Sequence, residues 1–254
     1  MNAAVKIAWE EQGAGEPLLL IQGLGYGRWG WDPVVPGLAE RFRVLTFDNR
    51  GIGESDKPEG PYTAREMAAD ALQVLDEAGV PRAHVVGASL GGMIAQEVAV
   101  AAPERVDRLV LCCTTPGGAA SVPMPEVTIR LFQEAPSLAP EIALRRFVAN
   151  ALGSSPPDEL VDELFARRVA SPPDPAGWQA QAAAGTTFPG VEGELVAPTL
   201  ILQGTEDNVV DQRNAQVLAE RIGGARVELF RGSGHLFFWE QPDAFVRIVS
   251  EFLT

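Results

Sequence analysis

A serine, an aspartate and a histidine, each following a separate apolar run, carry the strongest chemical signal in this sequence. The serine is Ser89, in the segment GASLG at 87–91, which fits the pattern G-x-S-x-G and lies between an apolar run and a helix-like run. A serine in such a strained strand-to-helix turn is exposed at the end of its strand and acts as a nucleophile. The alternative is a serine that only caps the following helix. The strand–turn–helix context favours the nucleophile.

A serine hydroxyl is a weak nucleophile and needs a base to accept its proton. The chain contains two histidines. His84 begins the same apolar run that leads to Ser89, which places it roughly 16 Å away at about 3.3 Å per residue of strand. His235 instead ends the segment RGSGH at 231–235, after the last strand candidate. The sequence therefore predicts His235 as the base and a structural role for His84.

The imidazole of such a base is held in the right tautomer by a carboxylate. Asp207 follows the apolar run 199–203 and is the predicted partner. Glu206 and Asp211 lie nearby in the chain and are the alternatives. The predicted hydroxyl, imidazole and carboxylate would together form a catalytic triad.

These residues need a scaffold that brings the ends of several strands together. Short runs rich in apolar and β-branched residues alternate with helix-like segments, and several are almost continuously apolar, as strands are when helices cover both faces of a parallel sheet. This alternation predicts an α/β fold, whose parallel strands end at one edge where ligands bind. The predicted strands are 5–9, 18–22, 44–48, 84–88, 109–113, 199–203 and 226–230, and the helices alternating with them are 64–78, 90–101, 212–221 and 243–252.

The segment 116–197 breaks this alternation. It contains no convincing strand and is rich in proline and glycine. Its aliphatic and aromatic residues favour a folded insertion over a disordered loop of this length. We therefore predict a core made of residues 1–115 and 198–254 and a helical insertion at 116–197, with helices at 126–134, 141–152, 158–170 and 176–184.

The composition is that of a folded protein: 254 residues, of which 46% are hydrophobic and 21% are charged. The formal net charge of −14 argues against nucleic acid or an anionic membrane surface as partner, because both require clustered lysine and arginine. No run approaches the ~20 apolar residues of a membrane span, and the first residues lack the apolar stretch of a signal peptide. The composition leaves a homo-oligomer open.

Two cysteines, Cys112 and Cys113, are adjacent in a predicted strand, where neighbouring side chains point to opposite faces and are poorly placed to bond to each other. We interpret both as small buried hydrophobes. Without a disulfide framework, a reducing cytoplasm is the predicted location. The sequence shows no metal-ligand spacing and no glycine-rich phosphate loop, so neither a metal nor another cofactor is expected.

With the triad, three further segments make the chain resemble the α/β-hydrolase superfamily from end to end. DNRGIGES at 48–55 is similar to the family's D-x-R-G-x-G-x-S turn, PTLILQGTED at 198–207 to its P-T-L-x-x-x-G-x-x-D segment, and GHLFFWEQP at 234–242 to its G-H-x-x-x-x-E-x-P ending. The order serine, aspartate, histidine is also that of the family. The resemblance is to its small serine esterases, enol-lactonases and cofactor-free haloperoxidases. It implies a mostly parallel eight-stranded sheet with helices on both faces and a helical cap after the sixth strand.

The resemblance also implies the groups that hold the oxyanion and the substrate. One backbone N–H would come from Leu90, after the nucleophile, and the second from an H-G-x-G loop. The matching residues are QGLG at 22–25, which makes Leu24 the second donor and puts Gln22 where histidine is usual; its amide can still brace the loop. The expected substrate-binding residues are Gly23, Tyr26, Trp29, Trp178 and Leu236.

The function implied is hydrolysis of a carboxylic ester or lactone through an acyl-enzyme on Ser89, with a small molecule as substrate. Serine at this position argues against haloalkane dehalogenase or epoxide hydrolase chemistry, which uses an aspartate there. Cleavage of a C–C bond in a diketone, and perhydrolase or haloperoxidase-like activity, stay open because they use the same triad. The alternative of another class is a non-catalytic ligand receptor on a hydrolase scaffold.

Overall fold

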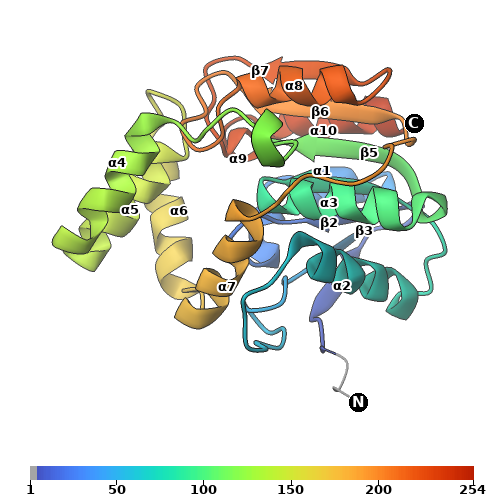
Figure 1. Ribbon diagram of the computed structural model, residues 1–254, viewed down its shortest axis with the longest axis horizontal. Coiled ribbons are helices and arrows are strands. Elements are labelled where there is room, and N and C mark those ends of the chain that lie inside the picture. The colour runs from blue at the N-terminus through green and yellow to red at the C-terminus, as the bar shows by residue number, and fades with distance from the viewer. Residues whose placement is uncertain (1–4) are drawn as a thin grey trace.

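One seven-stranded sheet forms the centre of the molecule (Figure 1). The structure is a computed structural model, and it describes residues 5–254. The strand order is β1-β3-β2-β4-β5-β6-β7, with β1 antiparallel to β3 and every other neighbouring pair parallel. The strands are β1 (Trp9–Gln12), β2 (Glu16–Ile21), β3 (Phe42–Phe47), β4 (Ala83–Ala88), β5 (Val106–Cys112), β6 (Thr199–Gly204) and β7 (Arg226–Phe230).

Helices cover both faces of this sheet (Figure 1). Alternate residues of the central strands enter two separate cores: in β2, Leu19 and Ile21 belong to one core and Leu18 and Leu20 to the other. Burial of both faces explains why these strands read as continuous apolar runs. The first core is closed by α2 (Ala64–Glu77), α3 (Leu90–Ala101) and α8 (Arg213–Arg221), and the second by α1 (Val35–Ala39), α9 (Phe237–Glu240) and α10 (Pro242–Leu253).

Local signals in the sequence set where α2 begins and ends. The hydroxyl of Thr63 accepts the N–H of Glu66 at 3.1 Å, and the Glu66 carboxylate accepts the N–H of Thr63 at 2.9 Å, which is a capping box. Gly79, just beyond the helix, has a φ of 66° that glycine adopts without strain. For this reason the predicted helix 64–78 agrees with the observed one to a single residue.

Four α-helices and two short 3-10 helices, and no strand, occupy the chain between β5 and β6. The ends of the α-helices lie within two residues of those predicted, and α4 and α5 stand away from the sheet (Figure 1). We propose that 116–197 is a unit inserted into a core made of 1–115 and 198–254. No helix in the described part of the chain is long and apolar enough to cross a membrane. The four helices are α4 (Glu126–Glu134), α5 (Pro140–Asn150), α6 (Asp158–Ala170) and α7 (Pro175–Thr186).

The fold class is as predicted, and the observed sheet differs from the expected one in two details. The described residues form seven strands rather than eight, so the insertion follows the fifth strand and not the sixth. The predicted strand 5–9 is displaced as well, because the residues that pair with β3 are Trp9–Gln12. The carbonyl oxygens of Lys6 and Ala8 instead accept N–H groups of the turn 48–56, both at 2.9 Å. The beginning of the apolar run is therefore bonded to a turn rather than to a strand.

Candidate active site

Four neighbouring parallel strands end at one edge of the sheet, and a polar side chain follows each of them. Ser89 comes directly after β4 and Cys113 directly after β5. Asp207 lies in the loop after β6, and His235 in the loop after β7. Because β4, β5, β6 and β7 are adjacent in that order, these loops lie next to one another. The edge is the one at which the sequence predicts the triad.

Ser89 occupies a strained turn between β4 and α3. Its φ of 56° and ψ of −119° lie in a region that residues with a side chain rarely adopt. A Cβ on Gly87 would lie 2.2 Å from the carbonyl oxygen of Gly91, and a Cβ on Gly91 would lie 2.1 Å from that of Ile21. Neither glycine of the motif can therefore carry a side chain. The Ser89 hydroxyl makes no capping hydrogen bond to α3, which argues against the helix-cap alternative.

The carboxylate of Asp207 is hydrogen-bonded to the imidazole of His235, with Oδ2 and Nδ1 2.8 Å apart and both residues buried. Oδ2 also accepts a hydrogen bond from Gln203 Nε2 at 2.8 Å. Oδ1 accepts the backbone N–H groups of Val209 and Val210 at 2.8 and 2.9 Å. These bonds fix the orientation of the carboxylate, so one oxygen faces the ring and leaves Nε2 as the nitrogen that can accept a proton.

The alternatives to Asp207 and His235 lie elsewhere. Glu206 is only partly buried and accepts the backbone N–H of Ser154 at 2.6 Å, and Asp211 forms an ion pair with Arg213 at 2.7 Å. His84 is buried in the first half of β4, beside acidic side chains of neighbouring strands. The geometry thus brings together Asp207 and His235, the pair that the sequence favours.

Cys113 is the second side chain beside the His235 ring, and the two groups shift each other's pKa. Burial raises the pKa of this thiol to about 11, so it is uncharged near neutral pH. Burial lowers the pKa of His235, but Asp207, with a smaller contribution from Cys113, outweighs that effect and holds the pKa well above the usual histidine value. Both cysteines are buried and unbonded, as predicted.

The hydroxyl of Ser89 is not hydrogen-bonded to His235; among the described residues, the hydrogen bond of the ring is the one to Asp207. Catalytic hydrogen bonds are often long without substrate and tighten in its complex, so this geometry does not exclude the base. Gly23 approaches the nucleophile, since a Cβ placed on it would lie 3.0 Å from the Cβ of Ser89. The predicted oxyanion loop therefore lies directly against Ser89.

Near Ser89, two backbone N–H groups have no hydrogen-bond partner among the described residues. In the loop, the N–H of Gly23 is bonded to the Gln22 side chain at 2.7 Å, and that of Gly25 to the Gln181 side chain at 3.0 Å. The amide between them, Leu24 N–H, has no partner among the described residues. Leu90 begins α3, and its N–H is one of those that a helix leaves unpaired. The two free donors are those that the sequence predicts for the oxyanion.

Gln22 braces the oxyanion loop with one end of its amide only. Its Oε1 accepts the Gly23 N–H, while its Nε2 is buried and has no partner. The carbonyl of Gln22 accepts a hydrogen bond from Asn49 Nδ2 at 2.8 Å, which ties the end of β2 to the turn after β3. The side chain of Gln22 therefore braces the loop through its amide oxygen, as expected for an amide in the place of histidine.

Of the expected substrate-binding residues, two aromatic rings pack together next to the oxyanion loop. The ring centroids of Tyr26 and Trp29 are 5.1 Å apart, and the guanidinium of Arg168 lies over the Tyr26 ring at 4.5 Å. Trp178, on α7, packs against Gly25. The fifth, Leu236, is buried in the second core beside His235. Their roles toward a substrate stay a proposal.

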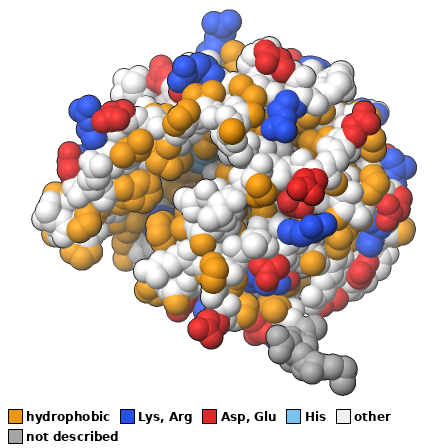
Figure 2. Space-filling view, viewed as in Figure 1, with side chains coloured by type: hydrophobic (Ala, Val, Ile, Leu, Met, Phe, Trp, Pro, Cys, Tyr) orange, Lys and Arg blue, Asp and Glu red, His pale blue; other side chains and the backbone are white. Residues whose placement is uncertain are grey.

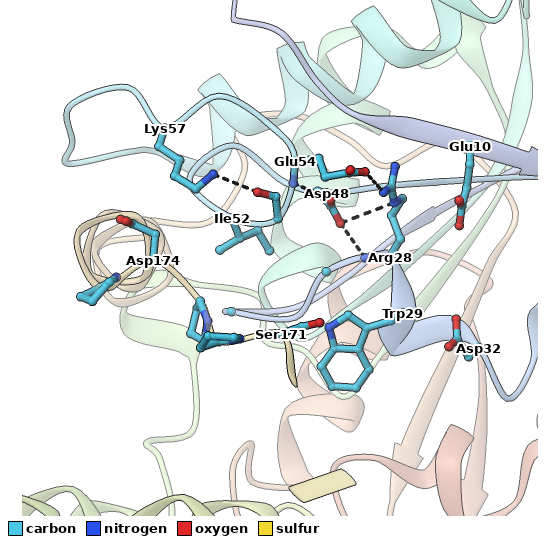
Figure 3. A pocket seen from close by; sticks show the side chains of 16 residues that line it. Glu10, Arg28, Trp29, Asp32, Asp48, Ile52, Glu54, Lys57, Ser171 and Asp174 are labelled. Carbon is cyan, nitrogen blue, oxygen red and sulfur yellow. Dashed lines mark hydrogen bonds and ion pairs between the residues drawn. The ribbon is translucent and has the colours of Figure 1, made fainter. Parts of the chain in front are cut away.

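A cavity of about 780 Å³ lies next to Gly25 of the oxyanion loop (Figure 3). It is lined by Trp29 and by charged residues, among them Arg28, Glu54 and Lys57, and it touches none of the triad residues. Arg28 is already paired with Glu54, and the Asp48 carboxylate is bonded to the backbone of the surrounding turns. These side chains brace the turn between β3 and α2, so the cavity is not the site of the triad.

Apolar side chains are exposed on the helices that stand away from the sheet. Val127, Phe132 and Ile142, on α4 and α5, are all exposed. Figure 2 shows hydrophobic side chains around a hollow between this part of the molecule and the rest. An apolar hollow with few polar groups is suited to an uncharged organic molecule.

Three residues near the site could not be identified from sequence patterns. Cys113 follows a strand like the triad residues, but it reads as an ordinary core cysteine. Arg168 and Gln181 lie on helices of the insertion, and their contacts in the oxyanion loop are 143 and 156 residues away in the chain. No local spacing connects residues so far apart.

The family model of the alpha/beta hydrolase fold matches residues 16–242, and the chain belongs to this family. It is an α/β hydrolase. It is 33% identical to a 2-hydroxy-6-oxononadienedioate/2-hydroxy-6-oxononatrienedioate hydrolase of Cupriavidus pinatubonensis, over 98% of this chain and 90% of the relative. An enol-lactonase of Burkholderia xenovorans shares 27% identity and a TM-score of 0.80, covering 98% of this chain and 96% of that one. A thermophilic esterase of Thermogutta terrifontis shares 25% identity and a TM-score of 0.82, covering 99% and 95%.

Proposed function

We propose that this α/β hydrolase cleaves a carboxylic ester or lactone through an acyl-enzyme on Ser89. The observation that carries the proposal is the buried 2.8 Å hydrogen bond between Asp207 and His235, at the same sheet edge as the strained Ser89 turn. The similarity to an enol-lactonase and an esterase supports this bond class. A non-catalytic receptor would need neither the strained turn nor the oriented imidazole.

In the proposed mechanism, Nε2 of His235 removes the proton of the Ser89 hydroxyl as its oxygen attacks the carbonyl carbon. The N–H groups of Leu24 and Leu90 hold the resulting oxyanion. The imidazolium, stabilised by Asp207, returns the proton to the leaving alcohol oxygen as the C–O bond breaks. Water then attacks the acyl-enzyme with His235 again as base, which releases the carboxylic acid and restores Ser89.

A fluorophosphonate probe tests this proposal. We expect a single covalent adduct, located on Ser89 by mass spectrometry and absent after denaturation, because only the folded site activates the hydroxyl. The variant Ser89→Ala is expected to lose p-nitrophenyl acetate turnover by about 10⁶-fold, as removal of a triad nucleophile does. A folded protein that binds small esters but takes no adduct would favour the receptor alternative.

Cleavage of a C–C bond in an anionic diketone is the second candidate, and Arg168 favours it. Its guanidinium lies at the oxyanion loop and, in the described chain, pairs with no carboxylate, whereas the neighbouring Arg167 pairs with Asp32 and Glu163. An unpaired cation there is suited to a substrate carboxylate, and the Cupriavidus relative is named for a dioate. Comparing kcat/KM for neutral esters, lactones and vinylogous diketone acids decides between the two candidates. A preference for the neutral esters or lactones supports the first.

A further inference from the structure

Gln181, on α7 of the insertion, joins two loops of the core. It is fully buried, and both ends of its amide are bonded to backbone. Its Oε1 accepts the N–H of Gly25 at 3.0 Å, and its Nε2 donates to the carbonyl of Arg50 at 2.8 Å. The first bond holds the oxyanion loop, and the second holds the turn that follows β3.

The first half of α7 is fixed to the core by backbone contacts. A Cβ on Gly177 would lie 1.8 Å from the carbonyl oxygen of Gly51, so the helix and the turn pack with no side chain between them. The carbonyl of Ala180 accepts the N–H of Tyr62 at 3.2 Å. Gln181 lies one turn after Gly177 on the same side of the helix, which places its amide over the loops rather than in solvent.

Side chains of two helices of the insertion, α6 and α7, contact Gly25 from several sides. Its N–H is bonded to Gln181, its carbonyl accepts a hydrogen bond from Arg168 on α6, and a Cβ on it would lie 2.6 Å from the Trp178 ring. Gly25 has a φ of 70°, so the chain reverses here directly after Leu24. The direction of the Leu24 N–H therefore depends on contacts supplied by the insertion.

We propose that Gln181 is a positioning residue that aims the Leu24 N–H at the oxyanion. The inference rests on the proposed function, because it concerns the donor that stabilises the tetrahedral intermediate. Gln181 touches neither Ser89 nor His235 by hydrogen bond; it acts through the peptide of Gly25. The insertion thus supplies part of the catalytic geometry and does not only cover the site.

The test compares Gln181→Met with Gln96→Met. Methionine has a similar length but neither donates nor accepts like an amide. Gln96 is a matched control, since it is a buried glutamine whose Nε2 donates to the carbonyls of Gly92 and Thr115, away from the oxyanion loop. We expect Gln181→Met to lower kcat for p-nitrophenyl acetate by about 10- to 100-fold, less than the 10²–10³ for loss of a whole oxyanion donor. Gln96→Met should lower stability similarly and leave kcat unchanged.

Binding of inhibitors separates positioning from general loosening of the fold. A trifluoromethyl ketone forms a hemiketal oxyanion with Ser89, whereas the corresponding secondary alcohol does not. In Gln181→Met the Ki of the ketone should rise by the same factor by which kcat falls, and the Ki of the alcohol should stay unchanged. Equal weakening of both inhibitors, or an unchanged kcat, would overturn the proposal.

A second variant keeps the test decisive if Gln181→Met does not fold. Gln181→Glu retains an acceptor oxygen for the Gly25 N–H and is expected to keep most of the wild-type kcat. If this variant folds but its kcat falls by the 10²–10³ expected for loss of the Leu24 donor, the bond from the Gly25 N–H to residue 181 does not position that donor. The inference is then wrong. Failure of the wild type to take the fluorophosphonate adduct would refute the proposed function itself, which is a separate outcome.

Discussion

His235 and Asp207 form a buried pair, and the chemistry of the pair depends on which neighbouring side chain raises the pKa of the imidazole. The Cys113 thiol also contacts the imidazole, but its pKa of about 11 keeps it neutral at physiological pH. The carboxylate of Asp207, fixed by four hydrogen bonds, is therefore the group that raises the pKa of His235 most. The proposed base must be unprotonated to act, so we expect this pKa to set the acid limit of activity.

We expect the acid limb of the kcat/KM profile to lie on the alkaline side of ordinary histidine titration, because the pKa of His235 is raised. The variant Asp207→Asn removes the charge, so the limb should move to lower pH and kcat should fall by about 10⁴-fold through loss of the right tautomer. Asp211→Asn, which changes a partly buried carboxylate nearby, should stay within about twofold of wild type. Equal effects of the two substitutions would refute the assignment of Asp207.

Short structural elements bring the catalytic loop to its place. α9 begins two residues after His235, and its Glu240 accepts the N–H groups of Gly234 at 2.7 Å and of Gly153 at 2.9 Å. The carboxylate thus joins the histidine loop to the end of α5 in the insertion. Burial raises the pKa of Glu240, and the two N–H donors oppose that effect.

The variant Glu240→Ala leaves both N–H groups without their partner, which should lower the free energy of unfolding by about 1–3 kcal/mol. It should also reduce kcat, because Gly234 precedes the base. Urea unfolding monitored by tryptophan fluorescence measures the first effect. In contrast, Glu251→Ala removes an exposed carboxylate that contacts Arg247 at 3.5 Å and should change stability by less than about 0.5 kcal/mol. A stability loss no larger than that of this control would contradict the role of Glu240.

On the scale of the whole molecule, the core and the insertion each supply part of the candidate site. The core supplies the sheet edge with the residues of the proposed triad, and α6 and α7 supply Arg168 and Gln181 to the proposed oxyanion loop. The two parts approach each other closely at Gly177 and Gly51, where backbone packs against backbone. The fit of α7 on the core should therefore control activity as well as stability.

Two glycines of α7 test this coupling. In Gly177→Ala the new Cβ would meet the Gly51 carbonyl oxygen at 1.8 Å, so α7 must shift, and we expect a loss of about 1–3 kcal/mol of stability together with a fall in kcat. In Gly185→Ala the new Cβ would lie 3.7 Å from Leu90 Cδ1, an ordinary contact. That variant should be neutral or up to about 1 kcal/mol more stable, because alanine favours helix. Thermal unfolding and steady-state kinetics of both variants measure the effects, and full activity of Gly177→Ala would contradict the coupling.

The sequence by itself determined most of the strands, the helices and the order of the proposed triad residues, because these depend on local information. Apolar runs, a capping box at Thr63 and the two glycines around Ser89 act over a few residues each. The helices of the insertion were predicted for the same reason. The first strand was misplaced because an apolar run indicates burial but not the hydrogen-bond partner of its backbone. At Lys6 and Ala8 that partner is a turn and not a strand.

Only the tertiary structure decided which groups meet at the sheet edge. The sequence left Glu206 and Asp211 as rivals of Asp207, and the bond to His235 separates them. It gave no sign that Gln181 holds Gly25, 156 residues away. Such contacts depend on how whole helices pack on the sheet, and packing is a sum over many distant residues that no short pattern contains.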